Sequence, residues 1–378
     1  MRTNKLCAVL SGIKKFEDLK PLTNKRPLAT LPFDCKYRLI DFPLSSIVNA
    51  SINTIFMIFN EDETQSVFDH LGGGKEWNLD AIQHHYFIHL YQEFLKKKER
   101  GEPYYDKLID YLHKSKSEYT VVMGSKILCN IDLQAVLNVH QNQKNDITVV
   151  YKRVPENRIM ATDNLLNLSD TGTITGAYLL EDAQERGDAH NLSMEIYMVQ
   201  TEWLIDLLEK GQMEGSSADL HVIIQSQIQK IKSSAYEYTG YLGNIFDIDS
   251  YYQVSMDMLE VNKFNSLLYS NKKIYTKLKN EVPTYYSENS QVKNSHFATG
   301  CFIEGNVKNS LLSRKTIIKS GAEVADSIVL PNVSIEENAT VKYAILDKNV
   351  IVESGAEVIG TPDNIKVVAK GAVVSKEG

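Results

Sequence analysis

The sequence predicts an α/β domain with a doubly wound sheet, followed by a parallel β-helix. The first part is indicated by a helical segment that begins near Pro43 and leads into Ile52–Phe59, an almost unbroken apolar run. Such a run is typical of a strand that is buried on both faces of a parallel sheet. The second part is indicated by a six-residue repeat near the end of the chain. We expect the α/β domain over residues 1–268, a linker over 269–290 and the β-helix over 291–378.

The composition is that of an ordinary globular protein. The 378 residues are 43% hydrophobic and 24% charged, and the chain is long enough for two domains. The net charge of -7 argues against a nucleic-acid partner, and no apolar run approaches the ~18 residues of a membrane span. The cysteines are scattered and the sequence leads straight into a strand, so we expect reduced thiols, no signal peptide and a cytoplasmic protein.

Strands and helices alternate along the first domain, which indicates a doubly wound sheet. The predicted strands are Leu6–Leu10, Ile52–Phe59, Tyr119–Met123, Asp146–Tyr151 and Met194–Val199. The predicted helices are Leu79–Arg100, a helix capped by Asp132, Trp203–Lys210, Leu220–Lys232 and Ile245–Leu268. The cap is predicted because an aspartate directly precedes apolar residues at helical spacing.

The ligand site of such a sheet lies beyond the carboxyl ends of its strands, where Ser11, Gly12 and Ser125 should lie. A single glycine followed by bulky residues makes a poor phosphate cradle, because side chains block the approach of the backbone. His85 and His89 stand four residues apart on a predicted helix, as a metal-binding pair would, but no third ligand is obvious.

Four cations gather before the first long helix. Lys25 and Arg26 lie in a turn, and Lys36 and Arg38 lie just before the helix that begins near Pro43. Lys25 and Arg26 are ordinarily explained as part of a solvated loop. Lys36 and Arg38 are not explained by an ordinary α/β core segment. Clustered Lys and Arg near the positive end of a helix favour binding of an anion such as a phosphate.

The C-terminal repeat predicts the β-helix. Four copies begin 17, 17 and 16 residues apart, at Ile318, Ile335, Val352 and Val368. Within the first copy, aliphatic residues recur every six positions, at Leu312, Ile318, Val324 and Leu330. One aliphatic side chain per step points inward, alanine fits the tight corner, and glycine or asparagine takes the left-handed turn.

An α/β domain followed by a hexapeptide helix resembles the ADP-glucose pyrophosphorylases, or glucose-1-phosphate adenylyltransferases, over nearly the whole chain. Asp34–Ser46 is similar to the family's Gly-Gly-Lys-Phe/Tyr-Arg-Ile-Ile-Asp-Phe-x-Leu-Ser-Asn. His70–Asp80 resembles His-Ile-Gly-x-Gly-x-x-Trp-Asp-Leu-Asp, and Ser216–His221 resembles Ser-Ser-x-Asp-Phe-Gly with histidine at the glycine. The resemblance implies a nucleotidyltransferase-type mixed sheet and a left-handed β-helix.

The family's catalytic motifs do not carry over. Its two metal-binding aspartates align with Ser125 and Tyr241, and the lysines that neutralise phosphate align with Leu28 and Asp182. Mg²⁺ needs carboxylate ligands, and nucleotidyl transfer depends on that charge. The resemblance therefore implies no catalytic residue, no metal site and no cofactor in this chain, with Mg²⁺ expected only in a catalytic partner.

Such a chain resembles the variant subunit that accompanies the catalytic one in some low-GC Gram-positive bacteria. The resemblance implies a regulatory partner of a catalytic ADP-glucose pyrophosphorylase subunit, in a heterotetramer that serves glycogen biosynthesis. The family's activator site uses the lysine that Lys36 matches. Lys36, Arg38, Lys25 and Arg26 are therefore expected to bind a sugar-phosphate effector.

Two alternatives stay open. An active sugar-1-phosphate nucleotidyltransferase with a rebuilt metal site would have to use Glu17, Asp18 or Asp247 as ligands. A hexapeptide acyltransferase is disfavoured, because those enzymes commonly use a histidine base in the β-helix and no histidine follows His296. Binding of Mg²⁺ and ATP to the isolated chain would discriminate between the regulatory and the enzymatic hypotheses.

Overall fold

The computed structural model describes residues 5–80, 85–183, 187–270 and 272–376. The chain forms two compact units, each built from discontinuous segments. The first, called the sheet unit, comprises Met1–Lys14, Ile40–Asn244 and Ser270–Tyr275. The second, called the coil unit, comprises Lys15–Leu39, Ile245–Tyr269 and Thr276–Gly378. The coil unit thus contains the predicted β-helix together with two earlier segments of the chain.

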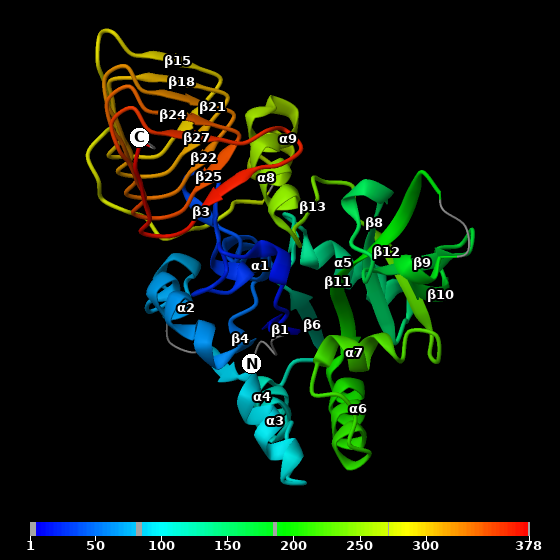
Figure 1. Cartoon of the computed structure of the whole chain (residues 1–378). Coiled ribbons are helices and arrows are strands. Elements are labelled where there is room, and N and C mark those ends of the chain that lie inside the picture. The colour runs from blue at the N-terminus through cyan, green and yellow to red at the C-terminus, as the bar shows by residue number, and fades with distance from the viewer. Residues whose placement is uncertain (1–4, 81–84, 184–186, 271, 377–378) are drawn as a thin grey trace. The chain divides into compact units, whose positions relative to one another are not determined.

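The sheet unit is built around a mixed sheet, as predicted (Figure 1). Its strands follow the order β10 (Ile174–Leu179), β9 (Asn164–Leu168), β11 (Ala189–Gln200), β6 (Tyr119–Gly124), β1 (Leu6–Gly12), β4 (Thr54–Phe59) and β5 (His85–Leu90), with β8 (Ile147–Pro155) pairing β11 and β12 (Ser233–Glu237) pairing β8. Strands β6, β1, β4 and β5 are parallel, whereas β11 runs antiparallel to β6 and β8. The parallel part places the carboxyl ends of β1 and β6 at one edge.

The apolar strands are buried on both faces. Cys7 and Val9 of β1 belong to a core cluster that includes residues of α4 and α6. Ala8 and Leu10 alternate with them, so they point to the opposite face, and they are fully buried as well. This explains why the strands read as continuous apolar runs rather than as alternating patterns.

The helices of the sheet unit match the predicted positions in part, since α2 and α4 were not predicted. They are α1 (Asp41–Asn49), α2 (Thr64–Leu71), α3 (Tyr91–Glu99), α4 (Asp106–Ser115), α5 (Leu133–Gln143), α6 (Thr201–Met213) and α7 (Leu220–Gln225). The predicted cap at Asp132 is confirmed, since its carboxylate accepts hydrogen bonds from the Gln134 and Ala135 amides. The helix predicted over Leu220–Lys232 ends early, because the Ser226 hydroxyl bonds the Ile223 carbonyl oxygen at 2.7 Å.

The helix predicted over Leu79–Arg100 is wrong in its first half. Residues 81–84 lie outside the described part of the chain, and His85–Leu90 forms β5, which pairs in parallel with β4. Only Tyr91–Glu99 is helical. The aromatic and aliphatic residues of β5 extend the sheet, so tertiary pairing overrides the helical spacing. The His89 ring stacks on the Phe56 ring with 4.4 Å between the ring centroids, so His89 packs in the sheet.

The coil unit holds a parallel β-helix, as predicted. Figure 1 shows its coils stacked one above another, coloured from yellow to red. One face, called face D, is formed by β14 (Tyr285–Tyr286), β17 (Phe302–Ile303), β20 (Ile317–Ile318), β23 (Ser334–Ile335), β26 (Ile351–Val352) and β29 (Val373–Val374). Face E is formed by β15 (Gln291–Lys293), β18 (Asn306–Lys308), β21 (Glu323–Ala325), β24 (Thr340–Lys342) and β27 (Glu357–Ile359). Face F is formed by β16 (His296–Phe297), β19 (Leu311–Leu312), β22 (Ile328–Val329), β25 (Ala344–Leu346) and β28 (Lys366–Val368).

The six-residue pattern works as predicted. The inward side chains of Ile318 and Val324 are 0% and 2% exposed, and they stack on their counterparts in the next coil. Glycine and asparagine take the left-handed corners between faces D and E: φ is 72° at Gly321, 57° at Asn338 and 66° at Gly355. The repeat therefore encodes both the core and the corners.

Two helices and a short ribbon complete the coil unit. The helix predicted over Ile245–Leu268 is instead two, α8 (Ile248–Met256) and α9 (Val261–Leu268), separated by a turn of 3-10 helix. The first begins late because the Asp247 side chain caps it in a capping box with Ser250. The ribbon pairs β2 (Pro32–Phe33) with β3 (Tyr37–Arg38). Among the described residues, no helix has the length and apolar character needed to cross a membrane.

We predict that Val341→Asp unfolds the coil unit. Val341 is fully buried in the β-helix core, and an unpaired carboxylate there should destabilise it by about 4 kcal/mol or more. The matched control is Thr340→Asp, because Thr340 precedes Val341 in β24 and points outward from face E. Thermal melting followed by circular dichroism should show an early or missing transition for Val341→Asp only. Equal melting temperatures for both variants would contradict this inward register.

Candidate functional site

The sheet ends at one edge beside β1 and β6. Ser11 pairs with Gly124 in the parallel register of these strands, and Ser125 follows directly. Ile196 of the antiparallel β11 pairs with Met123, so Glu195 reaches the same edge. The predicted juxtaposition of Ser11 and Ser125 is thus confirmed, but a third segment lies beside them.

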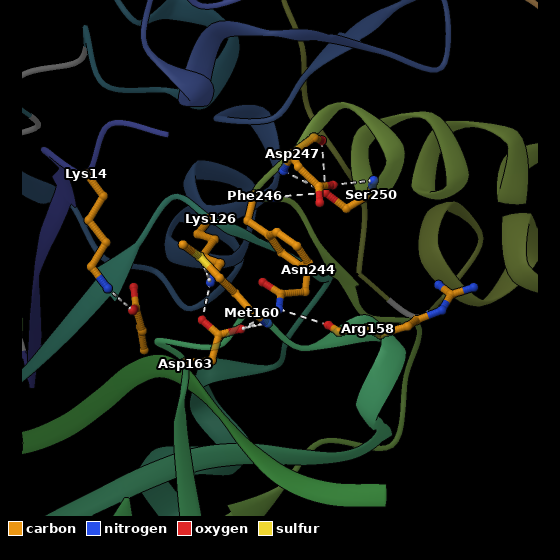
Figure 2. Close-up of polar contacts among 10 residues, drawn as sticks. Lys14, Lys126, Arg158, Met160, Asp163, Asn244, Phe246, Asp247 and Ser250 are labelled. Atoms are coloured by element: carbon orange, nitrogen blue, oxygen red, sulfur yellow. Dashed lines mark hydrogen bonds and ion pairs between the residues drawn. The ribbon is translucent and has the colours of Figure 1, made fainter. Parts of the chain in front are cut away.

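An ion pair between an exposed lysine and a buried glutamate lies at this edge. The Lys14 ammonium contacts the Glu195 carboxylate, whose side chain is 8% exposed (Figure 2 shows Lys14 and its dashed contact). Glu195 has φ of +55°, a left-handed conformation that non-glycine residues rarely adopt, at an irregular register of β11. A Cβ at Gly124 would come within 2.8 Å of Glu195 Oε2, so a larger residue there would displace this carboxylate. Glu195 was not predicted as a site residue, because no sequence pattern indicates a left-handed residue inside a strand.

The pKa shifts agree that both groups of the pair are charged. Burial alone would raise the pKa of the Glu195 carboxyl, but the charges of His221 and Lys14 lower it below its ordinary value. Burial works against the charged form of Lys14, yet the Glu195 carboxylate raises its pKa. The pair therefore persists across the neutral range, and the carboxylate is neutralised by a cation of the chain itself.

His221 closes the same edge from α7. The Asp219 side chain caps this helix by accepting a hydrogen bond from the His221 amide at 2.9 Å, which fixes the ring position. The ring is 2% exposed and lies 5.7 Å from the Tyr197 ring, and neither ring nitrogen has a hydrogen-bond partner among the described residues. Burial lowers the pKa of His221, whereas the charges of Glu195 and Asp219 act in the opposite direction. A large side chain thus stands where the resembling family has glycine.

A second pair, with both side chains buried, joins Lys126 and Asp163. Their side chains are 4% and 7% exposed. The other Asp163 oxygen accepts hydrogen bonds from the Asn244 amide at 2.7 Å and from the Met160 backbone at 2.9 Å (Figure 2). Asn244 also donates to the Arg158 carbonyl oxygen at 3.0 Å. Both oxygens of this carboxylate are therefore engaged, and its charge is matched by a lysine.

The two positions that align with the family's metal ligands flank one ribbon. Strand β7 (Ile127–Leu128) pairs antiparallel with β13 (Gly243–Asn244). Ser125 lies two residues before β7 and is half-buried, and Tyr241 lies two residues before β13 and is 8% exposed. Within the residues that the structure describes, no group of three or more His, Cys, Asp and Glu is arranged to hold a metal ion.

The best-matching motifs of the sequence meet inside the sheet unit. The Asp41 carboxylate, fully buried at the start of α1, is 2.5 Å from His70 Nε2. The His70 ring in turn lies edge-on to Trp77 at 5.6 Å. These residues hold α1 against the segment between His70 and Trp77, which contains three consecutive glycines, so this part of the match has a structural role.

The structure places the four predicted effector cations in the coil unit, in different environments. Lys25 and Lys36 are exposed, and the Lys36 ammonium lies 5.2 Å from the centroid of the Tyr37 ring. Arg38 is half-buried in β3. Arg26 is 7% exposed and forms an ion pair of 2.6 Å with the buried Asp347 of the β-helix. Arg26 therefore anchors its turn to the coils.

Further cations lie beside Arg26 and Arg38. Burial, followed by the charges of Arg38 and Arg26, lowers the pKa of Lys348 to about 7, and Arg314 contributes in the same direction. Sequence reasoning missed Arg314 and Lys348. Their signal was their spacing: two 17-residue periods separate them, so they occupy the same corner two coils apart. Arg26, Arg38, Arg314 and Lys348 are called the cationic corner.

The residues named for a rebuilt metal site are used otherwise. Asp247 caps α8, and Glu17 pairs with Lys20 at 2.6 Å on the surface. Asp18 is exposed in a short 3-10 turn. No observation thus favours the rebuilt site.

Two family models match the chain. A model described as nucleotidyl transferase matches residues 17–161. A model described as GlmU-like, C-terminal hexapeptide matches residues 281–378. Together they confirm the predicted fold class.

Curated proteins confirm the family. The chain is 31% identical to glycogen biosynthesis protein GlgD of Bacillus subtilis (strain 168) over 331 residues, which cover 86% of this chain and 84% of that protein. It is 32% identical to GlgD of Geobacillus stearothermophilus, with coverages of 85% and 83%. It is 27% identical to glucose-1-phosphate adenylyltransferase of Clostridium perfringens (strain SM101 / Type A), with coverages of 83% and 81%. The chain therefore belongs to the family of the glycogen biosynthesis protein GlgD.

Proposed function

We propose that this chain is a cytoplasmic, catalytically silent subunit of a glucose-1-phosphate adenylyltransferase in glycogen biosynthesis. It assembles with a catalytic homologue, as a heterotetramer, and tunes the formation of ADP-glucose from ATP and glucose 1-phosphate. The chain itself holds no Mg²⁺. The proposal rests on the family membership and on the pairing of buried carboxylates with lysines at the sheet edge.

One observation carries the claim of silence: each buried carboxylate described at this edge is neutralised by a lysine of the chain. Glu195 is paired with Lys14, and Asp163 with Lys126. A divalent cation would have to displace a lysine before it gained a carboxylate ligand. Ser125 and Tyr241 offer no carboxylate in their place. Transfer of a nucleotidyl group without the metal loses its main charge stabilisation.

The regulatory role is supported by the cationic corner. Burial is the main cause of the lowered pKa of Lys348, and an anion such as a sugar phosphate would relieve the repulsion from Arg38 and Arg26 that lowers it further. Arg38 is half-buried there, and arginine suits bidentate recognition of phosphate. Lys25 and Lys36 belong to the same unit and supply exposed cations for the proposed effector. Arg26 supports the site through Asp347.

We predict that the isolated chain makes ADP-glucose barely above background in the presence of Mg²⁺. The double variant Ser125→Asp/Tyr241→Asp should recover little, because Lys126 lies beside the restored carboxylate and the phosphate cradle is absent. A coupled pyrophosphate-release assay tests both, with a catalytic homologue as the positive control. Turnover near the ~10 s⁻¹ that is typical of enzymes would overturn the proposal of silence. Calorimetric binding of Mg²⁺ and ATP with turnover would favour an active enzyme.

We predict that Lys36→Ala and Arg38→Ala each leave the mixed complex intact but weaken its activation by fructose 1,6-bisphosphate. Loss of one charge-assisted contact of ~1.5–3 kcal/mol should raise the half-activating concentration about ten- to a hundredfold. Lys293→Ala is the matched control, because Lys293 is an exposed lysine of the same unit on face E. If Lys36→Ala and wild type gave superimposable curves, Lys36 would be surface charge only.

We predict that effector binding weakens as the pH rises from 7 to 8.5. Lys348 has a pKa of about 7, lowered from 10.5, so it loses its charge in this window. The phosphate, with a second pKa of ~6, is already almost fully ionised. Titration of the mixed complex at several pH values should show a rising half-activating concentration for wild type. Lys348→Arg should retain tight binding at high pH, and Lys348→Met should show weak binding with little pH dependence.

The lowered pKa of Lys348 also determines how the stability of the protein changes with pH. The unfolded chain binds more protons at Lys348 between pH 7 and 10.5, so the free energy of unfolding should rise with pH there. In Lys348→Met this contribution to the free energy of unfolding disappears.

For the binding experiment, a wild-type affinity for the effector that stayed constant between pH 7 and 8.5 would contradict a role for Lys348.

A further inference from the structure

Two consecutive residues between β2 and β3 lie in the left-handed region of the backbone. They belong to Asp34–Lys36, called the β2–β3 turn, and φ is +41° at Asp34 and +60° at Cys35. Aspartate adopts this region more readily than most residues, but for cysteine it is unfavourable because Cβ crowds the backbone. The motif that this segment resembles has glycine at both positions, and glycine enters the region without strain. The β2–β3 turn therefore carries a conformational cost that its surroundings must offset.

The hydrogen bonding inside the β2–β3 turn is tight as well. The Lys36 amide donates to the Asp34 carbonyl oxygen at 2.6 Å, which closes a three-residue turn with Cys35 at its centre. Such a turn with positive φ at its central residue is rare and strained. Directly after it the chain enters β3, which carries Arg38. The conformation of the turn thus determines where Lys36 and Arg38 lie.

His296 of the β-helix contacts both left-handed residues. Its Nδ1 lies 2.7 Å from Asp34 Oδ1, and the Asp34 side chain is 7% exposed. The Cys35 thiol donates a hydrogen bond to the His296 carbonyl oxygen at 3.4 Å. One residue thus holds the β2–β3 turn through its side chain and through its backbone. A hydrogen bond to a buried carboxylate is among the stronger polar contacts in a protein, so it can offset backbone strain.

His296 is itself fixed by two other parts of the coil unit. Its backbone amide donates to the Ser310 carbonyl oxygen at 3.0 Å, beside the pairing of β16 with β19. Its ring packs edge-on against Phe264 of α9, with 5.2 Å between the ring centroids. The imidazole is therefore held in place by the β-helix and by a helix, so it imposes a conformation on the β2–β3 turn.

We propose that His296 is a positioning residue that locks the strained β2–β3 turn and so presents Lys36 and Arg38 to a phosphorylated effector. The imidazole does not touch the effector, and its role is to keep the turn closed. Lys36 and Arg38 then need less ordering when the effector binds, which favours tight binding. The link to the effector rests on the proposed function, whereas the lock is a property of the isolated chain.

Hydrogen exchange of the full chain, read by mass spectrometry on the peptide with residues 34–39, measures opening of the turn. Loss of the hydrogen bond to the carboxylate should speed exchange of this peptide about 10- to 100-fold in His296→Ala. His296→Asn should lie closer to wild type, because its side-chain amide nitrogen stands near the place of Nδ1. The amides of β24 should stay equally protected in all three proteins. Exchange at the wild-type rate in His296→Ala would overturn the proposal.

Alkylation of Cys35 gives an independent measure of the same opening. Burial and the nearby Asp34 carboxylate raise the pKa of the Cys35 thiol, so the reactive thiolate is scarce while the turn is closed. Iodoacetamide should therefore label Cys35 slowly in wild type and faster in His296→Ala. Cys301, which is 2% exposed in the β-helix core, should remain unlabelled in both proteins if the coils stay folded. Equal labelling of Cys35 in the two folded proteins would contradict the lock.

Two double variants separate strain from contact. Asp34→Ala/Cys35→Ala and Asp34→Gly/Cys35→Gly both remove the side-chain contacts with His296. The alanine pair keeps the strain, whereas the glycine pair takes positive φ without it. The alanine pair should therefore open the turn and weaken activation of the mixed complex by fructose 1,6-bisphosphate, and the glycine pair should do neither.

The outcomes of this comparison are distinct. A glycine pair that opened the turn as far as the alanine pair would overturn the role of strain. An alanine pair that opened the turn but left activation unchanged would overturn the link to the effector, and with it the proposed effector site, while the lock would stand.

Discussion

Buried ion pairs fix both units of this protein. Lys126 and Asp163 join segments of the sheet unit, and Arg26 and Asp347 join the early turn of the coil unit to its β-helix. All four side chains are at most 8% exposed. Removing one partner of such a pair leaves a buried charge and typically destabilises a protein by ~3–5 kcal/mol. These contacts therefore identify Lys126 and Arg26 as structural cations.

Side chains that repeat or form long runs could be predicted from sequence. Apolar runs such as Thr54–Phe59 identified buried strands, and the six-residue period identified inward residues and corners of the β-helix. Asp132 was predictable as a cap because the capping signal is local. His85–Leu90 was not, because pairing with β4 decides its conformation. Local patterns report local preferences, and tertiary pairing overrides them where they are weak.

The partners of charged residues were beyond sequence reasoning. Lys25 and Arg26 are neighbours, yet one is exposed and the other is buried against Asp347, which lies 321 positions away. Glu195 gave no signal either, since its left-handed φ and its contact with Lys14 exist only in the folded sheet. The candidate site could be located from the carboxyl ends of the strands, but its chemistry depends on contacts between distant segments.

The residues at the sheet edge depend on one another. A left-handed residue such as Glu195 costs about 1–2 kcal/mol, and the contact with Lys14 offsets that cost. Gly124 must stay small for the same reason. Lys126 is committed to Asp163, so a carboxylate restored at position 125 would compete for a lysine already in use.

Charge balance therefore separates the two candidate sites. At the sheet edge Glu195 and Asp163 each contact a lysine, and a further anion such as a triphosphate would find no uncommitted cation in these two pairs. At the cationic corner the four named cations have two carboxylates beside them, Asp347 paired with Arg26 and Glu281 at 3.7 Å from Arg314, and burial together with repulsion from the charges of Arg38 and Arg26 lowers the pKa of Lys348 to about 7. An anion that enters the corner gains attraction and removes that repulsion, whereas one at the sheet edge gains neither. This difference in charge balance is the physical basis of the proposed effector site in the coil unit and of the proposed silence of the sheet unit.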